Sequence, residues 1–120
     1  MGVVYHASYL PWLEVARTDL VRSRGIPYAE MERRGYALAV AELTIRYRAP
    51  ARYDDEVSVT AKLLEVRSRS LRIDYEVTRV SDQVLLATAY TALVSIDTET
   101  EKPVALPSEI REMFEAPRNV

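Results

Sequence analysis

SYLPWLEVARTDLVRSR, residues 8–24, is the stretch of sequence that decides the fold. Its apolar side chains recur three and four residues apart, which predicts an amphipathic helix. Ser8 is a suitable N-cap, and Gly25 provides the stop. The stripe expected to face the core consists of Leu10, Leu13, Ala16 and Leu20.

After this helix the period of the apolar residues changes from 3.6 to 2, which predicts strands. A short second helix is expected over 27–34 and ends at Gly35. The apolar parity flips near Ala41 and Glu42, which predicts a β-bulge there. Strands are expected over 37–48, 56–66, 70–79 and 84–96, and a terminal helix over 108–114. One long helix followed by a run of antiparallel strands predicts an α+β fold, with one sheet wrapped around one helix.

The last expected strand, 84–96, carries apolar residues on both faces. Such a strand is buried on both sides. The helix covers one face, and a chain of this size has no second layer to spare for the other. This pattern predicts a subunit interface and a homo-oligomer.

The composition and net charge of the chain argue against several classes of function. The chain has 120 residues, a net charge of -2, one histidine and no cysteine. These values predict a single domain over 1–120, no nucleic-acid partner, no disulfide and no metal site. No apolar run reaches the length of a membrane span, and residues 1–7 lack the features of a signal peptide. We therefore expect a cytoplasmic protein.

Four runs of sequence carry a family resemblance: GVVYHASYL (2–10), EVART (14–18), YRAPARYDD (47–55) and KPVALP (102–107). Together they resemble the hotdog acyl-CoA thioesterases of the 4-hydroxybenzoyl-CoA thioesterase class, closest to the bacterial short-chain branch associated with the Tol–Pal system. The resemblance implies a hotdog fold, an antiparallel sheet around one long helix, assembled as a dimer of dimers with active sites between subunits. The family's first strand would precede Met1, so an open, distorted sheet edge is expected.

The resemblance implies hydrolysis of short-chain or aromatic acyl-CoA thioesters to free acid and CoA, without a metal or other cofactor. In the family pattern Asp-x-x-Gly-Val-Val-Tyr-His, the catalytic Asp would lie two residues before Met1. The alternative is therefore a catalytically silent hotdog protein that binds acyl-CoA or a partner. A hydroxyacyl dehydratase is disfavoured, because its histidine-containing motif is absent from the sequence.

The candidate catalytic residues are Tyr5, His6 and Glu14. By resemblance, the backbone N–H of His6 polarises the thioester carbonyl, and Tyr5 and Tyr9 flank this site, where they could line an acyl pocket. For the His6 side chain, packing or capping at the helix entry is the expected role. Glu14 could act as a helix carboxylate; its alternative is an ion pair with Arg17.

The candidate substrate-binding residues, besides Tyr9, are Arg67, Ser68, Arg69 and Lys102. By resemblance, this hairpin turn and Lys102 hold the nucleotide phosphates of CoA, which favour cations. The alternative is an ordinary solvated turn. The adjacent acids Asp54 and Asp55 lie in a turn motif and are expected to cap it rather than to act in catalysis.

Overall fold

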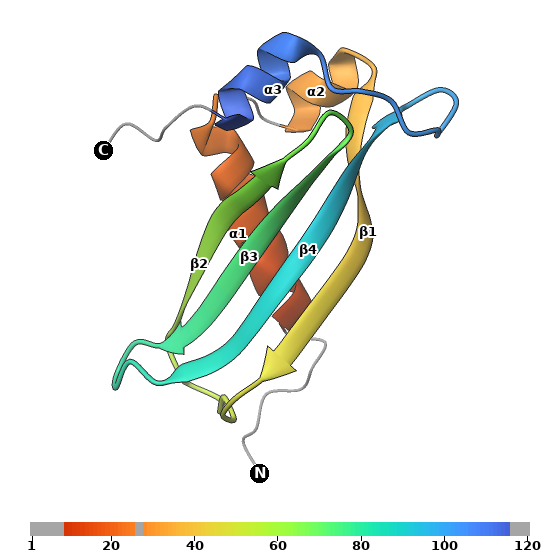
Figure 1. The fold of residues 1–120 in the computed structure, drawn as a ribbon. Coiled ribbons are helices and arrows are strands. Elements are labelled where there is room, and N and C mark those ends of the chain that lie inside the picture. The colour runs from red at the N-terminus through yellow and green to blue at the C-terminus, as the bar shows by residue number, and fades with distance from the viewer. Residues whose placement is uncertain (1–8, 26–27, 116–120) are drawn as a thin grey trace.

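The computed structural model describes residues 9–25 and 28–115. Three helices and four strands occur in this part of the chain, each close to its expected range (Figure 1). In chain order they are α1 (Tyr9–Ser23), α2 (Tyr28–Arg33), β1 (Tyr36–Tyr47), β2 (Val57–Val66), β3 (Ser70–Arg79), β4 (Leu85–Asp97) and α3 (Ser108–Glu115).

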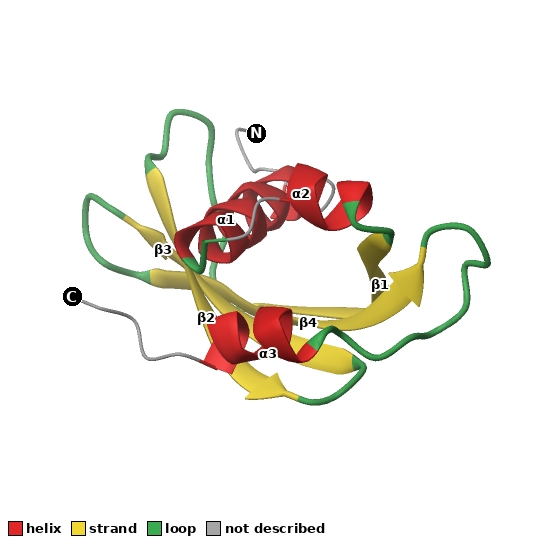
Figure 2. Ribbon diagram, turned by 90° about the horizontal axis from the view of Figure 1, so that it is seen from above, coloured by secondary structure: helices red, strands yellow, loops and turns green. Residues whose placement is uncertain are grey.

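The four strands form one antiparallel sheet in the order β1-β4-β3-β2. Helices α1 and α2 lie against one face of this sheet, as the view from above shows (Figure 2). Helix α3 lies across the end of the sheet near the β2–β3 hairpin, where the Leu106 N–H donates to the Ser68 carbonyl (2.8 Å). The expected sheet wrapped around one long helix is confirmed.

Helix α1 buries a slightly different stripe from the expected one. Tyr9, Leu13 and Leu20 are buried, whereas Leu10 is 40% exposed, so the prediction that Leu10 faces the core is wrong. Val21 in the last turn is also fully buried. The angle around the helix does not by itself explain the exposure of Leu10, because Leu10 lies about 100° and Val21 about 120° from Tyr9. Gly25 follows the helix with a φ of 93°, as its role as the stop requires.

The face of the sheet toward α1 carries the core. The β3 residues expected to point inward, Leu71, Ile73, Tyr75 and Val77, are all buried. The predicted bulge in β1 is also confirmed, because the register against β4 shifts between Val40 and Glu42. The hydroxyls of Tyr75 and Thr91 lie 2.8 Å apart in this interior and satisfy one another.

The opposite face of β4 is half-buried in the single chain. It carries Thr88, Tyr90, Ala92 and Val94, and the Arg72 guanidinium lies 4.1 Å from the centroid of the Tyr90 ring. Polar side chains of the neighbouring strands therefore share this face with small apolar ones. The subunit interface expected from the apolar pattern of β4 stays a prediction.

Strand β2 is an edge strand in the described part of the chain. The sequence predicted an open edge without indicating which strand would form it. Its pairing with β3 continues along the strand, with one register shift between Leu63 and Glu65. The Val80 N–H donates to the Glu56 carbonyl (2.9 Å). Antiparallel pairing alternates, so the backbone groups of Val57, Val59 and Ala61 point toward the open edge.

Candidate functional site

The first turn of α1 is held by an aromatic cluster of Tyr9, Trp12 and Tyr47. The Tyr9 ring lies 5.0 Å from the Trp12 ring and 5.1 Å from the Tyr47 ring, both edge to face. Tyr9 is only 2% exposed. Its burial, and to a smaller extent Tyr47, raises the pKa of the Tyr9 phenol. In the single chain Tyr9 is therefore a packing residue, and its predicted role in lining an acyl pocket stays a prediction.

The other candidates near this helix are Tyr5, His6 and Glu14. Tyr5 and His6 lie outside the described residues, so their predicted roles are not tested. Glu14 is exposed and lies five residues past Tyr9, which places it about 140° around α1 from Tyr9. Helix N-termini carry free N–H groups and a partial positive charge, so the entry to α1 suits a developing oxyanion.

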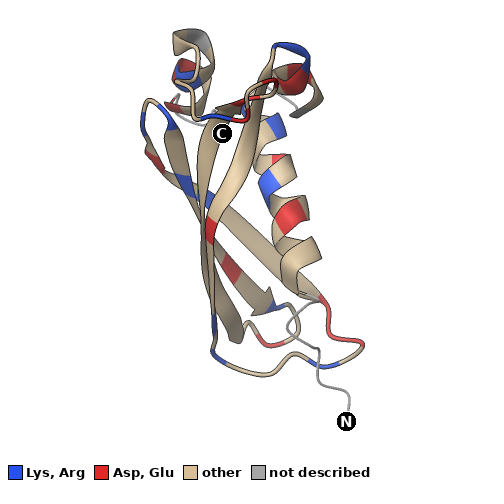
Figure 3. Ribbon diagram, turned by 90° about the vertical axis from the view of Figure 1, so that its right-hand side faces the viewer, with Lys and Arg blue, Asp and Glu red and all other residues tan. Residues whose placement is uncertain are grey.

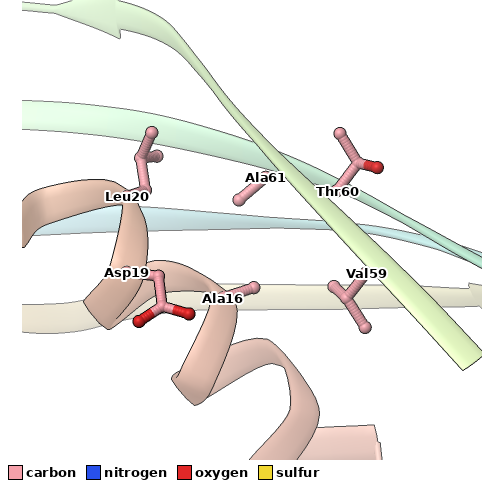
Figure 4. Close-up of a pocket in the computed structure, with 6 residues that line it drawn as sticks. All are labelled: Ala16, Asp19, Leu20, Val59, Thr60 and Ala61. Atoms are coloured by element: carbon pink, nitrogen blue, oxygen red, sulfur yellow. The ribbon is translucent and has the colours of Figure 1, made fainter. Parts of the chain in front are cut away.

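A groove runs between α1 and the open edge of β2. It consists of two adjoining pockets of about 250 and 360 Å³, which share Ala16, Asp19 and Val59. Figure 4 shows Ala16 and Val59 facing each other across it. Asp19, which lines both pockets, is two-thirds exposed, and its carboxylate lies 3.6 Å from the Arg22 guanidinium. As far as residues 9–25 and 28–115 show, the groove offers apolar contact beside the outward-facing backbone groups of β2.

The predicted phosphate-binding residues lie at the β2–β3 hairpin and in the loop after β4. The Arg67 N–H donates to the Ser70 carbonyl, which confirms the tight hairpin, and the Ser95 N–H donates to the Arg69 carbonyl (both 2.8 Å). The side chains of Arg67, Ser68, Arg69 and Lys102 are exposed. Arg67 lies 3.4 Å from Glu65. The structure thus brings these residues to one end of the sheet, with cations open to solvent.

This basic end lies far from the entry to α1 in the same chain (Figure 1). Tyr47, which touches Tyr9, pairs with Ala87 on β4, and Ser70 of the hairpin pairs with Val94. Seven residues of β4 separate the two pairs, which is about 24 Å at 3.4 Å per residue. The structure therefore does not bring the predicted carbonyl-polarising end and the predicted phosphate-binding end together within one chain.

The connection between β1 and β2 is fixed by a network that the sequence did not reveal. Arg79, 18% exposed, donates to Asp55 (3.1 Å), Asp82 (2.8 Å) and the Pro50 carbonyl (2.9 Å). The Asp55 carboxylate also accepts the Arg52 N–H (2.9 Å), so its expected capping role is confirmed. The network holds this loop beside the end of β1, where Tyr47 meets Tyr9.

The charge distribution, the possible metal ligands and the helix lengths can also be read from the described residues. Figure 3 shows basic and acidic residues interspersed at both ends of the molecule. Within the described residues, no three His, Cys, Asp or Glu side chains gather as metal ligands. None of the helices described is long and apolar enough to cross a membrane.

Comparison with known proteins identifies the family. Residues 1–114 match the Thioesterase-like superfamily. The chain belongs to this superfamily. It is 34% identical over 109 residues to a protein of Escherichia coli named acyl-CoA thioester hydrolase YbgC, covering 91% of this chain and 81% of that protein.

Two solved structures confirm the hotdog fold of this Thioesterase-like chain. The DHNA-CoA thioesterase of Staphylococcus aureus superposes with a TM-score of 0.89 at 30% identity, covering 96% of this chain and 78% of that one. A hypothetical protein of Thermus thermophilus, TT1821, superposes with a TM-score of 0.87 at 37% identity, covering 96% and 86%.

Sequence reasoning missed Trp12 and Tyr47 as partners of Tyr9. The spacing of Tyr9 and Trp12, three residues apart on a helix, was an available signal for their contact. No local signal indicated the contact of Tyr47, because its position depends on how the end of β1 passes the first turn of α1. The contact of Arg79 with the β1–β2 connection gave no signal either, because Pro50 and Asp55 are 29 and 24 residues away along the chain.

Proposed function

We propose that this protein hydrolyses acyl-CoA thioesters, with short-chain or aromatic acyl groups, to the free acid and CoA. The observation that carries this proposal is the 34% identity, over 91% of the chain, to a protein named acyl-CoA thioester hydrolase. A second relative, from Bacillus subtilis, is named a putative acyl-CoA thioesterase and is 30% identical over 87% of the chain.

We further propose the 4-hydroxybenzoyl-CoA thioesterase class, and within it the branch associated with the Tol–Pal system, with a cytoplasmic location. The runs at 2–10 and 47–55 support this assignment, because they carry the resemblance to that branch. The second run also forms the loop that Asp55 and Arg79 hold beside the end of β1.

The proposed reaction is addition of water to the thioester carbonyl, followed by cleavage of the C–S bond. The His6 N–H at the entry to α1 donates to the oxyanion that forms, and Tyr5 flanks the site. A carboxylate takes the proton from water, and the proton is returned to the departing thiolate, so acid and thiol are the products. Glu14 is the candidate carboxylate in this chain. The reaction needs no metal and no other cofactor.

The substrate's nucleotide is proposed to bind at the hairpin, through Arg67, Ser68, Arg69 and Lys102. Exposed cations there are available to phosphate oxygens. The distance of about 24 Å between the hairpin and the α1 entry supports a site shared between copies. We propose a homo-oligomer, a dimer of dimers, in which the hairpin of one subunit serves the helix entry of another.

The test is release of free thiol from acyl-CoA thioesters by the purified full chain. A panel from acetyl-CoA and butyryl-CoA to benzoyl-CoA and palmitoyl-CoA covers the acyl classes. The proposal requires turnover of a short-chain or aromatic member that scales with enzyme concentration. Tight binding of these thioesters without turnover would instead support a silent acyl-CoA-binding protein.

A further inference from the structure

Tyr47 is the contact between the start of helix α1 and strand β1. It lies at the last position of the strand, and its ring meets the Tyr9 ring at 5.1 Å and 82°. Such edge-to-face pairs are favourable beyond the area that they bury. Tyr9 is the first residue of α1, so this contact acts on the helix end at which the oxyanion donor is proposed.

The two rings differ in what they contribute to the fold. Tyr9 is 2% exposed and belongs to the core, whereas Tyr47 is 40% exposed and stands at its margin. Truncating Tyr47 therefore removes a ring from the surface of the cluster without opening a cavity in the centre of the core. This truncation is expected to lower the free energy of unfolding only slightly, while it shifts the first turn of α1.

The backbone beneath Tyr47 is firmly held. Tyr47 pairs with Ala87 on β4, and the next two residues, Arg48 and Ala49, both donate to the Leu86 carbonyl (2.8 and 3.2 Å). The loop that follows is tied to β3 through Arg79 and Asp55. A ring on such a rigid base can set the position of whatever packs against it.

We propose that Tyr47 is a positioning residue of the thioesterase site, which acts through Tyr9 to place the N-terminal end of α1 against the substrate carbonyl. This inference rests on the proposed function. A donor must sit within hydrogen-bond reach of the oxyanion, and displacement of about 1 Å costs up to 100-fold in rate. Since the nucleotide of CoA is proposed to bind at the hairpin of another subunit, away from the Tyr47 ring, Tyr47 is expected to leave CoA binding unaffected.

The test compares Tyr47→Ala with Tyr47→Phe, which keeps the ring, and with Tyr53→Ala. Tyr53 is a matched control, because it is a 66% exposed tyrosine in the neighbouring loop and is not part of the cluster. Steady-state kinetics on the best acyl-CoA substrate give kcat and KM. Trp12, the one tryptophan of the chain, adjoins Tyr9 and reports by fluorescence quenching on the cluster itself.

For Tyr47→Ala we expect kcat to fall about tenfold with KM within twofold, and acrylamide to quench Trp12 more strongly. Tyr47→Phe should recover most of kcat, and Tyr53→Ala should match the parent in both readouts. A parent-like kcat in Tyr47→Ala would overturn the inference, as would loss of kcat in Tyr47→Ala and Tyr53→Ala in equal proportion. Absence of turnover in the unmodified protein would instead refute the proposed function, and this inference with it.

Discussion

Arg79 and Asp55 join two parts of the chain that are 24 residues apart, with Nε of Arg79 donating to Oδ2 of Asp55 over 3.1 Å. The pair ties the end of β3 to the connection between β1 and β2. The Arg52 N–H, and after it Arg79, hold the pKa of the Asp55 carboxyl below its usual value. The folded state therefore favours the ionised form of Asp55. Removing or protonating this carboxylate lowers the stability of the fold.

Asp55→Asn should lower the melting temperature at pH 7, because it removes the charge that pairs with Arg79. The matched control is Asp54→Asn, since Asp54 has a φ of 71° that asparagine tolerates. A lowered pKa in the folded state stabilises the protein above the unfolded-state value of about 3.9, and this contribution disappears as the pH falls through the folded-state pKa. The difference in melting temperature between Asp55→Asn and the parent should accordingly shrink in acid. An equal effect of both substitutions would contradict this account.

Tyr75→Phe should destabilise the fold by about 1–3 kcal/mol, because it leaves the buried Thr91 hydroxyl without its partner. Removing both hydroxyls, in Tyr75→Phe with Thr91→Val, should restore part of this loss. Tyr90→Phe is the control, since its bond to Glu42 is exposed. Urea unfolding of the parent, Tyr75→Phe, Thr91→Val and the double variant measures the coupling. Additive losses in the double variant would show that the two hydroxyls act independently.

Among the described residues, β2 has no strand on its outer side, so an added strand is expected to stabilise the protein. An eight-residue extension ahead of residue 1, alternating apolar and polar, could pair with Val57, Val59 and Ala61 and fill the groove beside Ala16. The melting temperature should rise by at least about 3 °C. The control extension has the same composition with a proline at its centre. Equal melting temperatures for the two would show that the edge takes no strand.

Arg67→Ala combined with Arg69→Ala should raise KM for a CoA thioester about tenfold, because two exposed cations each contribute up to about 1 kcal/mol. KM for an N-acetylcysteamine thioester of the same acid, which lacks the nucleotide, should not change. Arg46→Ala removes a comparable exposed cation from β1 and serves as the control. An unchanged KM for the CoA thioester would remove the hairpin from the proposed site.

The sequence predicted most of the fold because the patterns are local. The alternation of Leu71, Ile73, Tyr75 and Val77 assigned these residues to the buried face of the sheet. The change in this alternation placed the bulge near Ala41, and Gly25 and Gly35 marked where the first two helices stop. Leu13 and Leu20 of the predicted stripe are buried, but the exposure of Leu10 and the burial of Tyr9 and Val21 were missed. Periodicity alone cannot fix a helix's rotation against a sheet.

The candidate site was less predictable. Residue types and the resemblance suggested Glu14, Tyr9 and the hairpin arginines, but not their separation along the sheet. That separation follows from the register of β4 against its two neighbours, a tertiary property with no local signal. The contacts of Tyr47 with Tyr9 and of Arg79 with Asp55 depend on the same long-range geometry.

The central claim is that thioester hydrolysis uses the helix entry of one subunit and the hairpin of another. Subunit complementation tests it most directly. His6→Pro removes the proposed N–H donor, and the double arginine variant weakens the hairpin. Each alone should hydrolyse poorly at a CoA thioester concentration near the parent KM. After the two variants are mixed under conditions that exchange subunits, hybrid oligomers should regain activity well above the average of the two. Activity that stays at that average, although exchange is verified by mass spectrometry, would contradict a shared site.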